Sequence, residues 1–169
     1  MKRVADTVLT PRMVLRRPRG ADLAAYTAYC TSDRTRFAGG PFTAQNAYEK
    51  FAQMIGQWEI LGYGRWVMEF NGDPIGHVGP LSGAGVDTPE MTWTLWSAGH
   101  EGKGLATEAA RAAVHHLMTD CLWPDLRILI APANRASIRV AERIGAQATD
   151  EPAPEWAPGY ATYRLTVAA

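Results

Sequence analysis

The stretch Glu101-Gly102-Lys103-Gly104-Leu105 has the composition of an anion-binding turn. A strand pattern ends at about Trp96 and a helical pattern begins at Leu105, so the loop opens a helix whose first N–H groups have no intrahelical partner. Those N–H groups and the helix dipole attract a diphosphate, two glycines allow close backbone approach, and Lys103 adds a cation. The alternative is a glycine-rich turn without a ligand. Because both G-x-x-x-x-G-K-[ST] and G-x-G-x-x-G are absent, neither common nucleotide motif explains it.

The order of predicted helices and strands differs between the first and the second half of the chain. Helical spacing predicts helices over 21–31, 43–61, 105–120 and 134–145, and strand patterns predict strands over 13–17, 65–70, 74–81, 90–96, 126–131 and 160–167. Asn71-Gly72 is a hairpin signal between two of these strands, and 82–89 is expected to be a loop. The first half indicates an antiparallel meander, and the second half a strand–helix–strand crossover. We therefore expect one α/β (α+β) domain over 1–169, with a mixed sheet.

Composition narrows the class of protein. The 17 basic and 17 acidic residues balance, so nothing points to nucleic acid. No run of 18 apolar residues and no signal-like start is present, which makes the cytoplasm the default expectation and a membrane partner unexpected. Cys30 and Cys121 stand apart in apolar helical stretches, so we expect buried free thiols and no metal site.

Several motifs in order resemble the GNAT superfamily of N-acyltransferases. The register Glu101 to Ala106 is similar to its coenzyme A signature [QR]-x-x-G-x-[GA], with Glu in the first place. Leu15-Arg16-Arg17-Pro18 with Asp22, and the segments 74–79, 134–145 and 163–166, resemble the branch of ribosomal-protein alanine N-acetyltransferases. The resemblance spans about 12–167. It implies a three-layer αβα fold with a mainly antiparallel sheet of six to seven strands and about four helices.

The resemblance also implies acetyl-CoA as cosubstrate and a set of cofactor-binding residues. These residues lie on the fourth strand, in the loop and first turn of the following helix, and at the start of the next helix: Leu95, Trp96, Gly102, Lys103, Gly104, Leu105, Ala106, Thr107, Asn134 and Ser137. A backbone N–H of the fourth strand, near Trp96, would stabilise the oxyanion. Many family members place a Tyr acid seven residues after the Asn, and here that position is Ala141. Ser137 is the substitute that the closer branch implies. The alternative is that Asn134 only caps the helix and Ser137 is an ordinary first-turn residue.

For the general base, Glu90 is the candidate, acting through water, because it begins the strand expected beside the thioester. A solvated strand-edge carboxylate is the plainer alternative. His77 competes, since an ordinary imidazole titrates near neutral pH, although a lone strand His is more often structural. His115 and His116 are adjacent in a helix and cannot both face one ligand, so they are expected on the surface or in packing.

The predicted reaction is acetyl transfer to a primary amine by direct attack in a ternary complex, with a small molecule or a protein N-terminus as acceptor. A closed pocket would favour the small molecule and an open cleft the protein. Candidate acceptor walls are the loops 39–41 and 151–159 and the following side chains, each of which has a core or solvated alternative: Phe37, Phe42, Trp58, Trp93, Trp156, Arg34 and Arg36. The alternatives are a non-catalytic acyl-CoA sensor and a nucleotide-binding protein. Exposed strand edges leave both monomer and homodimer open.

Overall fold

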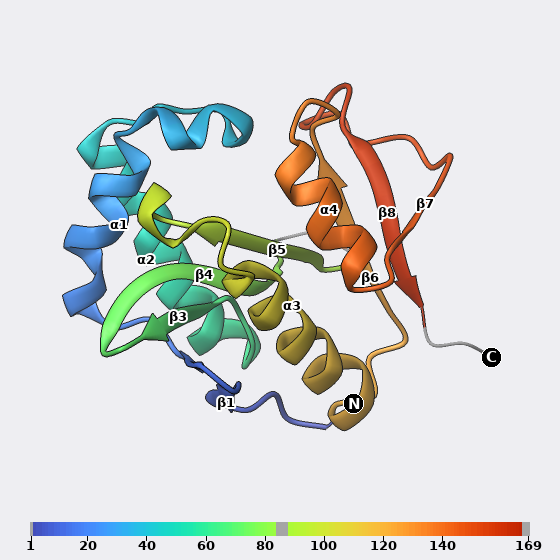
Figure 1. The fold of residues 1–169 in the computed structure, drawn as a ribbon, viewed down its shortest axis with the longest axis horizontal. Coiled ribbons are helices and arrows are strands. Elements are labelled where there is room, and N and C mark those ends of the chain that lie inside the picture. The colour runs from blue at the N-terminus through green and yellow to red at the C-terminus, as the bar shows by residue number, and fades with distance from the viewer. Residues whose placement is uncertain (1, 84–87, 167–169) are drawn as a thin grey trace.

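One eight-stranded sheet forms the centre of the fold, with strands in the order β1-β2-β3-β4-β5-β6-β8-β7 (Figure 1). The computed structural model describes residues 2–83 and 88–166. Every neighbouring pair is antiparallel except β5 and β6, which are parallel. The predicted mixed, mainly antiparallel sheet is therefore confirmed, with more strands than the expected six to seven.

The boundaries of most elements lie close to those predicted. The strands are β1 Thr7–Leu9, β2 Met13–Arg16, β3 Trp66–Phe70, β4 Asp73–Leu81, β5 Glu90–Leu95, β6 Asp125–Ile130, β7 Gln147–Ala148 and β8 Ala161–Thr166. The α-helices within the described residues are α1 Leu23–Cys30, α2 Ala44–Leu61, α3 Leu105–His115 and α4 Arg135–Arg143. Short 3-10 turns are η1 Gly20–Asp22, η2 Asp33–Ala38 and η3 Ala98–His100, and a π-helical turn, η4 His116–Asp120, extends α3.

Four short elements were not predicted: β1, β7, η2 and η3. β1 has three residues and β7 two, which is too few for an alternating pattern to show. The turn η2 is rich in polar residues and starts where the Ser32 side chain accepts a hydrogen bond from the Arg34 N–H. Residues 84–87 of the predicted loop and Val167 of the predicted last strand lie outside the described residues.

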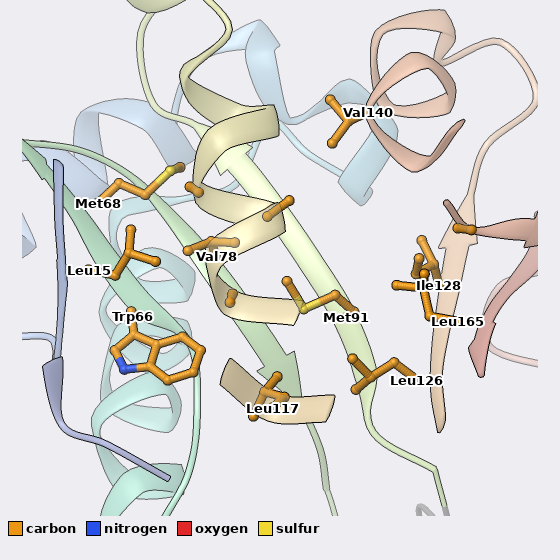
Figure 2. Packing of buried hydrophobic residues seen from close by; sticks show 14 of the residues in the cluster. Leu15, Trp66, Met68, Val78, Met91, Leu117, Leu126, Ile128, Val140 and Leu165 are labelled. Atoms are coloured by element: carbon orange, nitrogen blue, oxygen red, sulfur yellow. The ribbon is translucent and has the colours of Figure 1, made fainter. Parts of the chain in front are cut away.

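Helices cover both faces of the sheet, α1 and α2 on one and α3 and α4 on the other (Figure 1). One face of α3 is buried: Leu105, Ala109 and Ala113, followed by Leu117 in η4 and Cys121 just beyond, have at most 1% of their surface exposed. Figure 2 shows this helix packed over strand residues that include Trp66, Val78 and Met91. The three-layer αβα arrangement follows from these two helix pairs.

The beginning of α3 is fixed to the N-terminal strands. The Glu108 carboxylate accepts hydrogen bonds from Thr10 Oγ1 (2.7 Å), the Arg12 backbone N–H (2.9 Å) and Arg12 Nε (2.7 Å). Arg12 Nη1 also donates to the Lys103 carbonyl at 3.0 Å. A carboxylate in the first turn of a helix is stabilised by the positive end of the helix dipole. Here it also ties the start of α3 to the turn between β1 and β2.

Candidate active site

A cleft of about 1150 Å³ opens where β5 and β6 separate. Among the described residues the two strands pair only at Glu90 and Arg127, after which β6 continues beside β8. The cleft is walled by α1, η2 and β5 on one side and by β6, α4 and the loop before β8 on the other, with the start of α3 at one end. An unpaired stretch of β5 therefore faces the cleft.

The backbone of β5 offers hydrogen-bonding groups on this open edge. The Trp96 N–H donates to the Ile75 carbonyl on β4 at 2.8 Å. Since successive residues of a strand point their backbone groups to opposite sides, the N–H and carbonyl of Leu95 face away from β4, toward the separated β6. Leu95 lines the cleft, whereas Trp96 does not: its N–H is used within the sheet and its buried indole Nε1 donates to His77 Nδ1 at 2.9 Å.

The loop before α3 presents free N–H groups to the other end of the cleft. Gly102 and Gly104 have φ angles of +72° and +74°, a left-handed region that favours glycine. The first helical hydrogen bond runs from the Glu108 N–H to the Gly104 carbonyl. Consequently the N–H groups of residues 105–107 have no intrahelical acceptor. Gly102, Gly104 and residues 105–107 line the cleft, but Lys103 does not, because its carbonyl turns toward Arg12.

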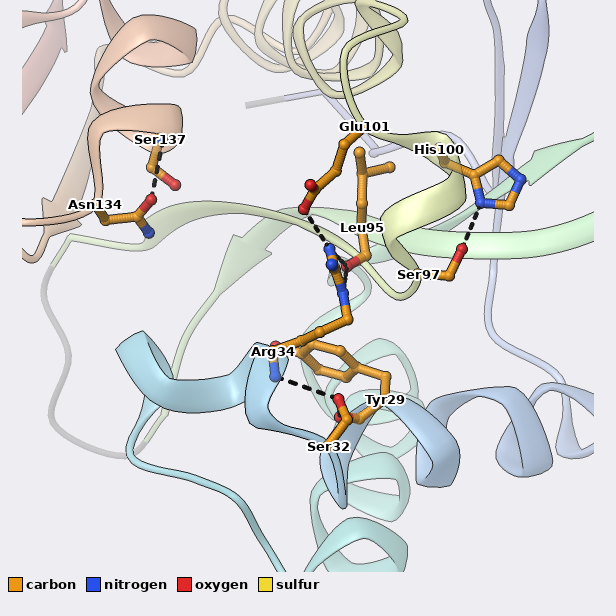
Figure 3. Close-up of polar contacts among 9 residues, drawn as sticks. All are labelled: Tyr29, Ser32, Arg34, Leu95, Ser97, His100, Glu101, Asn134 and Ser137. Carbon is orange, nitrogen blue, oxygen red and sulfur yellow. Dashed lines mark hydrogen bonds and ion pairs between the residues drawn. The ribbon is translucent and has the colours of Figure 1, made fainter.

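Asn134 and Ser137 lie on the opposite wall, at the start of α4. The Asn134 side-chain oxygen accepts a hydrogen bond from the Ser137 N–H at 3.2 Å, which is the predicted helix cap (Figure 3). Both residues line the cleft, and the Ser137 side chain is half-buried. Capping occupies the Asn134 oxygen and leaves its amide N–H groups and the Ser137 hydroxyl available to a ligand.

Glu90 lines the cleft at the one point where β5 and β6 meet. Burial raises the pKa of its carboxyl group to about 7, although the positive charges of Arg127 and Arg65 oppose the shift. A carboxyl group with this pKa exchanges its proton readily at neutral pH, which is what a general base or acid requires.

His77, the competing base, is committed to the fold. Its Nδ1 accepts the hydrogen bond from the Trp96 indole, so the ring proton must be on Nε2 and the imidazole keeps no free lone pair. Burial, and secondarily the charge of Arg65, lower the pKa of His77 well below its ordinary value. His77 is therefore a neutral residue that fixes the position of Trp96.

The comparisons with known proteins agree with this geometry. Residues 12–147 match the protein family described as the acetyltransferase (GNAT) domain. The chain belongs to the GNAT acetyltransferase family. It is also similar to an acetyltransferase from Agrobacterium tumefaciens str. C58, with 31% identity and a TM-score of 0.89, covering 99% of this chain and 98% of that one. The family and the acetyl-CoA cosubstrate predicted from the sequence are thereby confirmed for this domain.

Solved structures of lower sequence identity share the fold. RimJ from Mycobacterium smegmatis, solved with CoA-disulfide, has 17% identity and a TM-score of 0.75 over 95% of this chain and 87% of its own. An aminoglycoside acetyltransferase solved with coenzyme A has 23% identity and a TM-score of 0.73 over 90% and 93%. The curated Bacillus subtilis (strain 168) protein YkkB is 43% identical over 51 residues, so that match spans only 30% of each chain.

This GNAT chain departs from the family signature at Glu101, and the structure compensates with Arg34. Arg34 Nη2 donates to the Glu101 carboxylate at 2.8 Å and to the Leu95 carbonyl at 3.0 Å (Figure 3). The guanidinium thus neutralises the acidic side chain and joins η2 to the end of β5. Sequence reasoning treated Arg34 only as a possible acceptor contact, because 67 residues separate it from Glu101 and nothing in the sequence connects them.

Of the predicted acceptor-wall aromatics, Phe37, Phe42, Trp93 and Trp156 line the cleft. Trp58 does not: it is 3% exposed and packs edge-on against Trp66 in the core. Arg36 also lines the cleft. Sequence reasoning missed Tyr26, Tyr29 and Arg65, whose positions in a helix and before a strand carry no motif.

Three further residues named from the sequence, Ala141 and the two cysteines, lie in the core. Ala141, where many GNAT members have a Tyr, is fully buried in the core. Cys30 and Cys121 are buried free thiols, as predicted. Within residues 2–83 and 88–166, no group of three or more His, Cys, Asp or Glu side chains is arranged to hold a metal, and no helix is long and apolar enough to cross a membrane.

Proposed function

We propose that this protein transfers the acetyl group of acetyl-CoA to a primary amine by direct attack in a ternary complex. The observation that carries the proposal is a single cleft with two different ends. One end has free helix N–H groups and glycines, and the other has a half-buried carboxyl group, Glu90, with a pKa of about 7. Anion binding and proton transfer are the two requirements of this reaction.

The cleft suits an extended, diphosphate-bearing cosubstrate. Gly102, Gly104 and the N–H groups of residues 105–107 would hold the diphosphate at the positive end of α3. The open edge of β5 at Leu95 would receive the amides of the pantetheine arm as an added strand does, with Asn134 and Ser137 on the facing wall. Lys103 contributes through backbone geometry and general charge, since its carbonyl is bound by Arg12.

In the proposed reaction Glu90 accepts a proton from the acceptor ammonium group, directly or through one water. The freed nitrogen attacks the thioester carbonyl, and the Leu95 N–H, rather than that of Trp96, is the available donor to the oxyanion. The carbon–sulfur bond then breaks. The Ser137 hydroxyl or solvent supplies the proton that the departing thiolate takes, and the product amine loses its second proton. Holding both reactants in one cleft contributes several kcal/mol, since effective molarities for oriented reactants are large.

Calorimetric titration with acetyl-CoA, with ATP as control, tests the first half of this proposal. We expect saturable heat with acetyl-CoA and none with ATP. Thiol release in the presence of a panel of amines tests the second half. Binding of ATP in preference to acetyl-CoA would contradict the proposal and favour the nucleotide-binding alternative.

The second candidate function is a non-catalytic acyl-CoA sensor. The observation in its favour is Ala141, which leaves the cleft without the phenol found in many relatives. The names of the more distant structures indicate different acceptors, such as aminoglycosides, so they do not choose one for this chain. Saturable acetyl-CoA binding without thiol release across the amine panel would favour the sensor.

A further inference from the structure

A half-buried arginine at the acceptor end of the cleft has a side-chain N–H without a partner among the described residues. Arg65 immediately precedes β3 and lines the cleft together with Tyr26, Tyr29 and Glu90. Its Nε is buried and has no hydrogen-bond partner among the described residues. Burying an unpaired guanidinium N–H is costly, and a ligand in the cleft would supply the missing acceptor.

The charge of this end of the cleft is positive. The cationic side chains that line it, within the described part of the chain, are Arg36, Lys50 and Arg65, and the carboxylate is Glu90. Lys50 lies over the Phe42 ring at 4.4 Å, and Arg36 lies over the Phe37 ring at 4.7 Å. The other acidic side chain of the cleft, Glu101, is paired with Arg34 at the far end. A polycationic acceptor would therefore be repelled.

A hydrogen bond across the cleft limits the size of the acceptor. The Tyr160 hydroxyl, just before β8, donates to the Phe37 carbonyl in η2 at 2.6 Å. Trp156, Ala157 and Pro158 line the cleft from the same loop. The two walls are thus joined above the acceptor end, which suits a small molecule better than a folded protein.

We propose that the acceptor is a small amine that carries a carboxylate, with Arg65 binding the carboxylate while Glu90 faces the ammonium group. This inference rests on the proposed function and names its substrate class. The Arg65 guanidinium presents a planar fork that matches a carboxylate in a two-point contact. A carboxylate fits better than a phosphate, because its two oxygens match one two-point contact with Arg65 and its single charge is easier to accept beside the acidic Glu90. A zwitterion such as an amino acid complements the Arg65–Glu90 pair.

The chemical step balances with these groups alone. The ammonium group of the zwitterion gives one proton to Glu90, its nitrogen forms the amide bond, and the carbon–sulfur bond of the thioester breaks. The second nitrogen proton ends on the departing sulfur, so the products are an N-acetylated carboxylate and free coenzyme A. The carboxylate of the acceptor is unchanged throughout, which is why Arg65 acts as a binding residue.

The experiment compares matched acceptors with the full-length protein. The panel contains free amino acids and their amides, neutral alkylamines, spermidine, aminoalkylphosphonates and short peptides with acidic N-termini. Thiol release is measured with saturating acetyl-CoA, and kcat/KM is corrected for the fraction of free amine. We expect at least one amino acid to exceed its amide by about tenfold or more, as removal of a charged hydrogen-bond partner predicts.

Variants separate carboxylate binding from an effect on Glu90. Arg65→Gln should bring the ratio of acid to amide close to one, and Arg65→Lys should keep part of the preference. Arg19→Gln, which alters an exposed arginine outside the cleft, should leave the ratio unchanged. Acetyl-CoA titration of each variant shows that the fold is intact. An equal loss for acid and amide in Arg65→Gln would overturn the inference, because Arg65 would then act only through Glu90.

The other acceptors in the panel test the remaining parts of the inference. Faster turnover of neutral amines or spermidine would overturn the positive acceptor site, and preference for the phosphonates would overturn the carboxylate. Preference for acidic peptides over every free amino acid would overturn the small acceptor. Absence of heat with acetyl-CoA would instead overturn the proposed function itself.

Discussion

The two ends of the cleft differ in whether backbone or side-chain groups form them. The end at α3 consists mainly of backbone: N–H groups of residues 105–107, two glycines with positive φ, and the open edge of β5. The acceptor end consists of side chains from distant elements, with Arg65, Glu90 and Tyr26 brought together by the sheet and α1. A site made of backbone can bind one cosubstrate throughout a family, whereas a site made of side chains can change with the acceptor.

Replacing the proposed base, Glu90, should have the largest effect on activity and should alter only the acceptor end of the cleft. Glu90→Gln keeps the shape of the side chain but cannot accept the proton, so we expect kcat/KM to fall about 10²-fold or more, as for other general bases. Affinity for acetyl-CoA should not change. In the unaltered protein kcat/KM should rise with pH and level off above about 7, because the deprotonated carboxylate is the active form. A full rate in Glu90→Gln, with the same pH dependence, would show that another group is the base.

Disturbing the backbone end should weaken cosubstrate binding. Gly104 has a φ of +74°, so Gly104→Val must shift the loop whatever space is available. We expect the Kd for acetyl-CoA to rise about tenfold or more, since a non-glycine residue in this region costs on the order of 1–2 kcal/mol. Gly20→Ala is the control, since an added Cβ there meets no atom within 4 Å. Unchanged calorimetric affinity in Gly104→Val would mean that the loop does not hold the cosubstrate.

Arg34 is a side chain that supports the backbone end of the cleft, so its removal tests how far that end depends on a side chain. In Arg34→Gln the Glu101 charge is no longer paired and the Leu95 carbonyl loses its guanidinium donor. We expect the Kd for acetyl-CoA to rise roughly three- to tenfold, the range expected for a partly exposed ion pair and a hydrogen bond. The double variant Arg34→Gln/Glu101→Gln should regain part of the loss. If the double variant binds no better than Arg34→Gln, the repulsion by Glu101 is negligible.

A smaller effect is expected on stability. The pKa of Glu90 is raised in the folded protein from its ordinary 4.5 to about 7, so the folded state holds this proton more tightly than the unfolded chain. The free energy of unfolding therefore falls as the pH rises from 4.5 through 7. Above pH 7 the charged carboxylate destabilises the folded state. Glu90→Gln should raise the Tm by about 2–4 °C at pH 8, from a gain of about 1 kcal/mol after allowance for solvent screening.

The measurement is thermal unfolding of both proteins at pH 8 and at pH 5. At pH 5 the native Glu90 is protonated and resembles Gln, so the two Tm values should agree. A lower Tm for Glu90→Gln at pH 8 would indicate that the electrostatic attraction of the carboxylate to Arg127 and Arg65 exceeds the cost of its desolvation.

The same contrast explains what the sequence could predict. Periodicity located the long elements, and Asn71-Gly72, with φ angles of +52° and +86°, forms the predicted turn between β3 and β4. The Gly102–Gly104 motif was visible because backbone sites need glycine at fixed spacing. The ion pair of Arg34 with Glu101, the exposure of Arg65 to the cleft and the hydrogen bond that neutralises His77 depend on tertiary packing, which leaves no local pattern.

The single pairing of β5 with β6 has a mechanical consequence. Within the described residues, the strands β1 to β5 and the strands β6 to β8 form two half-sheets that pair with each other only at Glu90 and Arg127, where the Arg127 N–H donates to the Pro89 carbonyl. An extended cosubstrate bound along the Leu95 edge would pair with β5 as an added strand does and would connect the two half-sheets while it is bound. At a hundred times its Kd such a ligand adds about 2.7 kcal/mol to the free energy of unfolding. Cooperativity between the half-sheets, and with it the lifetime of the protein, would then follow the supply of acetyl-CoA.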